Sequence, residues 1–225
     1  MRIGLVSGLD WRDGIARLRA AGAELICLPL LSFAPWVAAK RDRAGLEHAE
    51  RPPSPSLLEA IELADGAWIS ASAYESEGEG VFYVSSYIAG PDGPVSRYRQ
   101  AAVVAEPGRY EQMFWSPGHE GNEVAASPLG PTGSLVGSDV RSAPAWEELV
   151  SAGARAVVCG VAEDAESWPQ TMTAVAGLAA LHSVIAVIVN RGGRSNDVEF
   201  PGGGAAFDRH GAEIGTGELI EVAPG

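Results

Sequence analysis

The sequence predicts an α/β fold in a single domain, on three observations. Apolar runs recur along the 225 residues, stretches with helical periodicity separate them, and a hydrophobic fraction of 46% is enough to bury a full core. Several of the apolar runs are continuous, which is typical of strands covered by helices on at least one face. Repeats are absent and only "EHAERPPSPS" resembles a linker. One domain over residues 1–225 is therefore expected.

Nine apolar runs are predicted to be strands. Near the middle of the chain, "AGPDGPV" predicts a hairpin turn because Pro91, Asp92 and Gly93 favour turn conformations. Two further charged stretches, "EGEG" and "SNDVEF", are expected to face solvent. The predicted strands cover residues 2–8, 23–31, 66–74, 81–89, 134–139, 154–161, 183–190, 203–208 and 217–223.

Four helices are predicted between these runs, over residues 10–22, 54–66, 142–154 and 167–183. Ser54, Ser142 and Ser167 each stand where a helix would begin, with a proline one or two residues later. A serine hydroxyl can accept a hydrogen bond from a free amide of the first turn, and proline is tolerated there. Gly22 is expected just past the end of the first helix.

Composition excludes some classes of partner. A formal net charge of −13 and a pI near 4.7 disfavour nucleic acids and anionic membrane surfaces, which would repel the protein. No segment approaches the roughly 20 apolar residues that a membrane span needs, so a cytoplasmic protein is expected. The two cysteines, Cys27 and Cys159, lie in strand-like runs and do not form a disulfide framework. Small molecules and other proteins remain as candidate partners.

Several segments carry a family resemblance when they are taken together and in order. They are "GAELICLPLLSF", "IAGPDGPVSRYRQ", "YEQMFWSPG", "GSLVGSDVRSAPAWEELVSAGARAVV", and "VIVNRGG" followed by "FPGGGAAFDRHGAEI". Over residues 1–221 this ordered set resembles the nitrilase-like carbon-nitrogen hydrolase superfamily, and its carbamoyl-amide hydrolase branch in particular. The resemblance implies a four-layer α-β-β-α sandwich in a single domain. It also implies a homo-oligomer or another protein partner, because subunits of this family usually pack face to face.

The family's chemistry, as the resemblance implies it, uses a cysteine nucleophile, a glutamate base and a lysine that stabilises the oxyanion. A thiol must lose its proton to attack, and the negative charge that develops on oxygen needs a fixed donor. The glutamate position falls on Leu30, the lysine position on Gln100 and the cysteine position on Gly137. All three are replaced, and residues 134–141 contain no cysteine that a shift of register would restore. The usual thioester mechanism is therefore not expected.

Other residues around these positions are candidates for a remaining site. Glu111 matches a second glutamate of the family, which helps to position substrate, or it is a solvated loop carboxylate. Asp139 and Arg141 keep the family pattern after Gly137, the position matched to the nucleophile, although such a pair more often caps a helix, here the one near Ser142, or forms an ion pair. Cys159 is a displaced nucleophile or a buried small residue, since no lysine or histidine stands near it in sequence. Trp115 and Trp168 either line an apolar pocket or only pack against neighbouring apolar side chains.

No cofactor is expected. The four histidines do not show the spacing of metal ligands, and no Cys/His cluster exists, so a metal is not predicted. "FPGGGAAF" lacks the Lys-Ser/Thr ending of a phosphate-binding loop.

Two functions remain. The first is a degenerate carbon-nitrogen hydrolase homologue, a pseudoenzyme that serves as a small-molecule-binding, scaffold or regulatory protein. The alternative is an enzyme with altered chemistry on a small amide, carbamoyl, nitrile or amine metabolite, using Glu111 with Asp139, or Cys159. Two carboxylates beside one crevice can take different pKa values and act as acid and base.

Overall fold

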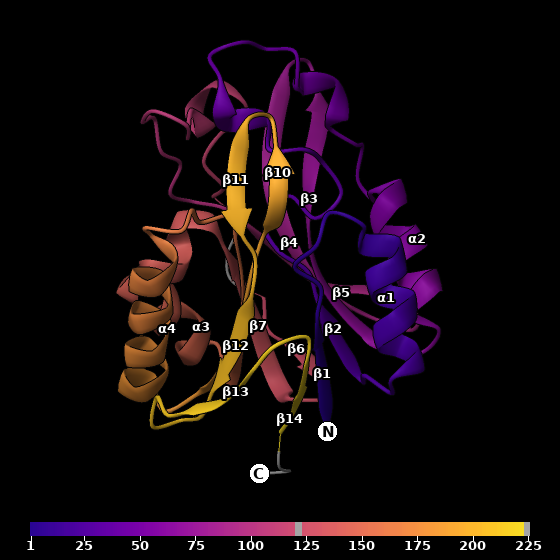
Figure 1. Ribbon diagram of the computed structural model, residues 1–225, viewed down its shortest axis with the longest axis vertical. Helices are drawn as coiled ribbons and strands as arrows, with labels where there is room; N and C mark the ends of the chain where they lie inside the picture. The colour runs from indigo at the N-terminus through magenta and orange to yellow at the C-terminus, as the bar shows by residue number, and fades with distance from the viewer. Residues whose placement is uncertain (120–122, 223–225) are drawn as a thin grey trace.

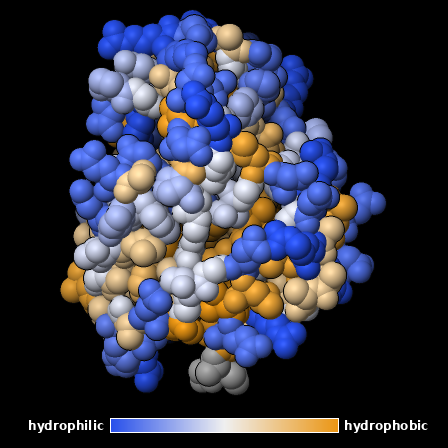
Figure 2. Space-filling model, viewed as in Figure 1, coloured by the Kyte–Doolittle hydropathy of each residue, from blue (hydrophilic) through white to orange (hydrophobic). Residues whose placement is uncertain are grey.

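The computed structural model describes residues 1–119 and 123–222, and it shows a four-layer α-β-β-α sandwich. Two six-stranded sheets pack face to face, and a pair of helices covers the outer face of each (Figure 1). The α/β prediction and the four-layer architecture are both confirmed. Polar side chains dominate the outer rims of the face in Figure 2, and apolar surface gathers near the line where the two halves meet.

The first sheet has the strand order β14-β1-β2-β3-β4-β5. Strands β1, β2 and β3 are parallel, β4 and β5 continue as an antiparallel meander, and β14 pairs antiparallel with β1. Helices α1 (Trp11–Ala20) and α2 (Pro55–Ala64) cover this sheet. Its strands are β1 (Arg2–Leu5), β2 (Leu25–Cys27), β3 (Trp68–Gly78), β4 (Val81–Gly90), β5 (Gly93–Arg99) and β14 (Leu219–Glu221).

The second sheet has the order β13-β12-β9-β8-β7-β6, with β7, β8 and β9 parallel. Helices α3 (Ala143–Ser151) and α4 (Trp168–His182) cover its outer face. A separate hairpin of β10 (Gly192–Ser195) and β11 (Val198–Pro201) extends beyond β12 (Figure 1). The strands of the sheet are β6 (Ala125–Ser127), β7 (Gly130–Val136), β8 (Ala156–Val161), β9 (Ile185–Asn190), β12 (Gly204–Phe207) and β13 (Glu213–Thr216).

Three apolar clusters hold the layers together. One lies between α1, α2 and the first sheet, a second lies under α3 and α4 and continues to one end of the sandwich, and a third fills the space between the sheets. Alternation along β8 shows how one strand serves two clusters: Val158 faces the other sheet, whereas Cys159 belongs to the cluster under the helices. This double burial explains why β8 and β9 are apolar without interruption.

The ends of the helices follow the sequence signals in part. Ser54 caps α2 by accepting a hydrogen bond from the amide of Leu57 (3.2 Å), and Gly22 has φ +82° directly after α1. Ser142 and Ser167 stand at the predicted cap positions of α3 and α4, but neither side chain caps its helix. The described residues also contain four short 3-10 helices: η1 (Val37–Ala39), η2 (Leu46–His48), η3 (Glu111–Met113) and η4 (Gly137–Arg141).

Four strands of the described residues, β6, β10, β11 and β13, lie outside the nine predicted runs and the predicted hairpin. The stretch "SNDVEF" lies in the β10–β11 hairpin, and Asn196 and Asp197 form its turn with φ values of +48° and +68°. The predicted strand over 217–223 is β14, and its last residue, Ala223, lies outside the described residues. No helix of residues 1–119 or 123–222 is long and apolar enough to cross a bilayer.

Candidate functional site

The three positions that the resemblance assigns to the family's catalytic residues all follow the ends of strands. Gln100 follows β5, Gly137 follows β7, and Leu30 stands three residues after β2. β5 and β2 belong to one sheet and β7 to the other, so the packing of the two sheets brings these chain segments together. Such strand ends are the usual place for a site in an α/β fold.

Gly137 and Gln100 are in direct contact. Gly137 has φ +59°, in the left-handed region that L-residues rarely adopt. A Cβ built on Gly137 would lie 2.7 Å from Nε2 and 2.9 Å from Cδ of Gln100. The amide of Gln100 therefore occupies the space that a side chain at position 137 would need.

Hydrogen bonds hold this amide in place. Nε2 of Gln100 donates to the carbonyl of Ala102 (2.8 Å) and to Oε2 of Glu111 (2.9 Å). Oε1 of Gln100 is buried and has no partner among the described residues. Gln100 is consequently a fixed neutral hydrogen-bond donor to Glu111, and its Oε1 is an acceptor that no donor of the described residues reaches.

Glu111 is fully buried in η3, not solvated. Its Oε2 also accepts a hydrogen bond from the amide of Val104 (3.2 Å), and its Oε1 accepts one from Nη2 of Arg109 (3.3 Å). Burial raises the pKa of Glu111 above its usual value, and the nearby Arg109 charge and these hydrogen bonds partly oppose that rise. The structure thus brings Glu111 and Gln100 together, as the resemblance implied.

Arg109 links Glu111 to a second buried carboxylate. Its Nη1 donates to Oε2 of Glu163 (3.1 Å), and Nη2 of the more exposed Arg141 lies 3.9 Å from Oε1 of Glu163. Two hydrogen bonds with Asn190, at 2.8 and 3.0 Å, fix the backbone of Glu163 just beyond β8. Two acidic and two basic side chains therefore alternate along this network and balance in charge.

Asp139 has a different set of partners. Its carboxylate accepts hydrogen bonds from the Tyr98 hydroxyl (2.6 Å) and from the amides of Ala101 (2.7 Å) and Ala102 (2.8 Å). Burial raises the pKa of Asp139, although these hydrogen bonds favour its charged form. The side chain does not cap α3, because only its backbone carbonyl meets the amide of Ser142. Asp139 instead fixes the segment that carries Gln100.

Leu30, Cys159 and Trp115 lie in the apolar cluster under α3 and α4 and its continuation. Leu30 and Cys159 have no exposed surface, and burial raises the pKa of the Cys159 thiol. Cys159 pairs with Leu135 and stands two residues before the end of β8. The structure does not bring Cys159 into the network around Gln100.

The two tryptophans differ in their surroundings. Trp115 is buried and packs edge to face against Trp36 (6.4 Å between ring centroids) and Tyr74 (6.0 Å). Trp168 is the first residue of α4 and packs against the apolar cluster, with Nε1 3.6 Å from the position of a Cβ built on Gly203. The backbone amide of Trp115 donates to the carbonyl of Glu111 (3.0 Å), and its buried indole Nε1 has no hydrogen-bond partner among the described residues.

Sequence reasoning missed Arg109, Glu163 and Tyr98. Tyr98 precedes Gln100 by two residues on β5, and Glu163 follows β8 at the same sheet edge as Gly137, so both carried a positional signal. Arg109 lies in a loop and had none. Within the described part of the chain, no group of three or more His, Cys, Asp or Glu side chains is placed to hold a metal ion.

The fold and the position of this network define the chain as a nitrilase-type α-β-β-α protein, and solved structures show the same class. A carbon-nitrogen hydrolase from Helicobacter pylori G27 superposes with a TM-score of 0.86 at 18% identity, covering 97% of this chain and 85% of the other. A variant of the amidase from Nesterenkonia sp. AN1, with the acetamide moiety of fluoroacetamide added covalently at the active-site cysteine, gives 0.80 at 19% identity, covering 99% and 90%. At these identities the likeness shows the fold.

The family follows from the sequence model of carbon-nitrogen hydrolases, which matches residues 9–215. This chain belongs to the carbon-nitrogen hydrolase family. The search of curated proteins found no significant match to the chain.

Proposed function

We propose that this member of the carbon-nitrogen hydrolase family does not carry out the thiol-dependent reaction and acts as a binding protein for a small polar molecule, in a scaffold or regulatory role. The observation that carries the proposal is the contact between Gln100 and Gly137. The amide of Gln100 fills the space in which a side chain at position 137 would begin, and two hydrogen bonds hold it there. A nucleophile at this position would require Gln100 to move.

The remaining residues also do not replace the missing chemistry. Leu30 cannot accept a proton, and the Cys159 thiol is buried with a raised pKa, which disfavours the thiolate that attacks carbonyl carbon. The Nesterenkonia amidase has an active-site cysteine. The matched position here is a glycine, so no thioester can form at it.

Unpaired polar atoms around Gly137 support a binding role. Gln100 Oε1, Ser138 Oγ and Arg109 Nε are buried without a hydrogen-bond partner in residues 1–119 and 123–222. A buried polar atom without a partner costs free energy of about 1–3 kcal/mol, which a ligand with matching donors and acceptors would recover. An amide or urea offers both kinds of group.

One observation favours the alternative, an enzyme of altered chemistry. The pKa values of Glu111 and Asp139 are both raised, and a raised carboxyl pKa suits a general acid. Each carboxylate, however, already receives three hydrogen bonds from the protein. The proposal therefore assigns both a structural role.

A substrate panel separates the two functions. The purified chain is incubated with carbamoyl amides, ureas, nitriles, amines and acids, while ammonia release, product formation and thermal stability are followed. We expect no turnover and an increase in Tm with at least one polar compound, smaller in Ser138→Ala than in the parent protein. Turnover that Glu111→Gln, Asp139→Asn or Cys159→Ser abolishes would instead establish the alternative.

A scaffold role also requires a second polypeptide, which we propose is another copy of this chain or a related protein. Light scattering coupled to size-exclusion chromatography measures self-association directly. A monomer at all concentrations would leave only the heteromeric form of the scaffold role.

A further inference from the structure

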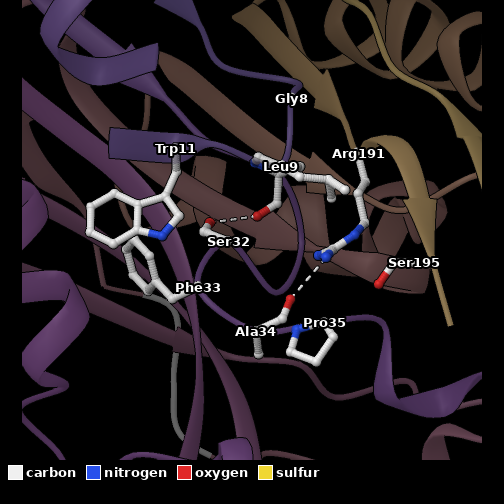
Figure 3. A pocket seen from close by; sticks show the side chains of 10 residues that line it. Gly8, Leu9, Trp11, Ser32, Phe33, Ala34, Pro35, Arg191 and Ser195 are labelled. Carbon is white, nitrogen blue, oxygen red and sulfur yellow. Dashed lines mark hydrogen bonds between the residues drawn. The ribbon is translucent and has the colours of Figure 1, made fainter. Parts of the chain in front are cut away.

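A separate cavity of about 260 Å³ opens beside the loop that follows β1 (Figure 3). It is bounded by the loop after β1, the loop after β2 and the start of the β10–β11 hairpin. None of the residues from the network around Gln100 lines it. The lining residues are Gly8, Leu9, Trp11, Pro29, Ser32, Phe33, Ala34, Pro35, Arg191 and Ser195.

Arg191 is the charged residue of this lining, and it is 5% exposed. Its Nη1 donates to the carbonyls of Leu31 (2.9 Å) and Leu30 (3.4 Å), and its Nη2 donates to the carbonyl of Ala34 (2.9 Å). A guanidinium has five N–H groups, so three contacts leave two of them unused. Nε is one of the two, since it is buried without a partner among the described residues.

The charge of Arg191 is also uncompensated. All three acceptors are neutral carbonyls, and no carboxylate of the described residues forms an ion pair with it within 4.0 Å. Burial lowers the pKa of Arg191 to about 10. Removing a charge from water is costly unless a counter-charge accompanies it. An anion in the neighbouring cavity would supply that counter-charge.

The other walls indicate what the anion would carry. The hydroxyl oxygen of Ser195 accepts a hydrogen bond from the backbone amide of Trp36 (2.7 Å). The hydroxyl hydrogen of Ser195 therefore remains available for donation to a ligand. Trp11 and Phe33 form an edge-to-face pair (4.9 Å between centroids). Figure 3 shows Arg191 and Ser195 on one side of the cavity and the two rings on the other. The cavity thus has a cationic, hydrogen-bonding end and an aromatic end.

We propose that this cavity is a binding site for a small carboxylate that carries an apolar or aromatic group. The carboxylate would bind at Arg191 and Ser195, and the apolar group would lie against Trp11 and Phe33. The cavity volume of about 260 Å³ is close to the lower end of the range for small-molecule pockets, so it suits a small ligand. The inference goes beyond the proposed function and does not depend on it, because it uses none of the residues around Gly137.

The probe is 3-phenylpropionate, compared with its neutral amide, in titration calorimetry on the intact protein. We expect saturable binding of the carboxylate and at least about tenfold weaker binding of the amide, a difference of about 1.4 kcal/mol. Equal binding of the two compounds, or no saturable binding of the carboxylate, would overturn the proposal.

A matched pair of variants tests the site without touching its buried arginine. Leu9 lines the cavity and is 48% exposed, so Leu9→Glu and Leu9→Gln differ in charge but hardly in size. We expect Leu9→Glu to weaken carboxylate binding at least about tenfold relative to Leu9→Gln, because its charge repels the anion and competes for Arg191. Equal affinity of the pair would count against the site. Arg191→Met should abolish binding, with circular dichroism as the check on its fold.

This test is independent of the catalytic one. Loss of carboxylate binding in Leu9→Glu leaves turnover in the substrate panel unaffected, and a rise in Tm that an acid causes is assigned to this cavity where Leu9→Glu removes it. Turnover in the substrate panel would likewise leave the assignment of the carboxylate site standing.

Discussion

Gly137 and Gln100 show how the residue types at two neighbouring positions can depend on each other. A left-handed backbone at the end of β7 favours glycine, and the absence of a side chain gives the amide of Gln100 its space. The amide then binds Glu111, which would otherwise have one fewer partner for its buried charge. The two residues are therefore expected to respond together to mutation.

Gly137→Ala tests this dependence. Strain in the left-handed region costs about 1–2 kcal/mol, and overpacking against Gln100 adds about 1–3 kcal/mol. Gly80→Ala is the control, since Gly80 has φ +79° and no atom within 4 Å of a built Cβ. Urea denaturation should show the larger loss in Gly137→Ala. Adding Gln100→Ala should make the remaining cost at position 137 comparable to that at position 80; if it does not, the contact is not the cause.

Glu111 gives a prediction about pH. Its pKa is raised in the folded state, so above the ordinary carboxyl pKa the folded protein holds a proton that the unfolded chain has lost. Its contribution to the free energy of unfolding therefore falls as pH rises from the ordinary carboxyl pKa through the raised one. The variant Glu111→Gln removes this dependence.

Denaturation between about pH 4 and pH 8 measures the effect. Relative to Glu111→Gln, the parent protein should be most stable at the acidic end and lose that advantage as pH rises. Glu147→Gln, at an exposed position on α3, controls for the change in net charge. A constant difference between parent and Glu111→Gln would contradict the shift.

Part of the candidate site was predictable from the sequence at the scale of single residues. Gln100 and Gly137 each directly follow a strand, so their proximity was predictable, whereas Glu111 lies in η3, well after the end of β5. The contact that excludes a side chain at 137 depends on how two sheets pack, and no local pattern carries that information. Arg109 and Glu163 meet for the same reason, through loops 54 residues apart in sequence.

At the scale of elements, the starts of α2 and α3 look alike in sequence but differ in structure. Ser54 and Ser142 both stand at the N-cap position, with proline at the start of the helix. Ser54 accepts the amide of Leu57 and donates to Glu50, whereas the Ser142 side chain makes no cap bond. The position of a cap was therefore predictable, but the rotamer that makes its bond was not.

The pair provides a matched experiment. Ser54→Ala should lower the free energy of unfolding by about 0.5–2 kcal/mol, because it removes the cap and a partner of Glu50. Ser142→Ala should change stability by less than about 0.5 kcal/mol. Chemical denaturation of both variants provides the measurement, and equal losses would refute a capping role specific to Ser54.

The hairpins show a second limit at this scale. "AGPDGPV" was predicted as a turn from its proline and glycine, and β4 and β5 do pair across Gly90 and Gly93. "SNDVEF" was expected only to face solvent, although consecutive Asn and Asp tolerate the positive φ of a tight hairpin turn. The strands on either side of this turn were not predicted, because β10 and β11 are short and expose several of their residues.

At the scale of the whole molecule, both cysteines report on global unfolding. Cys27 and Cys159 have no exposed surface, and burial raises the pKa of each thiol. Under native conditions an aromatic disulfide reagent should modify neither, and in denaturant it should modify both. Ala143→Cys, at an exposed position at the start of α3, is the positive control. Rapid reaction of a native thiol would show that the region around it opens separately.

The pairing of β14 with β1 has a consequence for how the protein is made. Arg2 lies opposite Glu221, so one of the two neighbours of β1 is synthesised 219 residues after it. Until then the outer edge of β1 offers unpaired amides and carbonyls to any other extended chain. Its other neighbour, β2, follows within 25 residues and can pair early. A nascent chain of this protein thus carries an open sheet edge while the residues between β1 and β14 are synthesised, and pairing with β14 closes that edge.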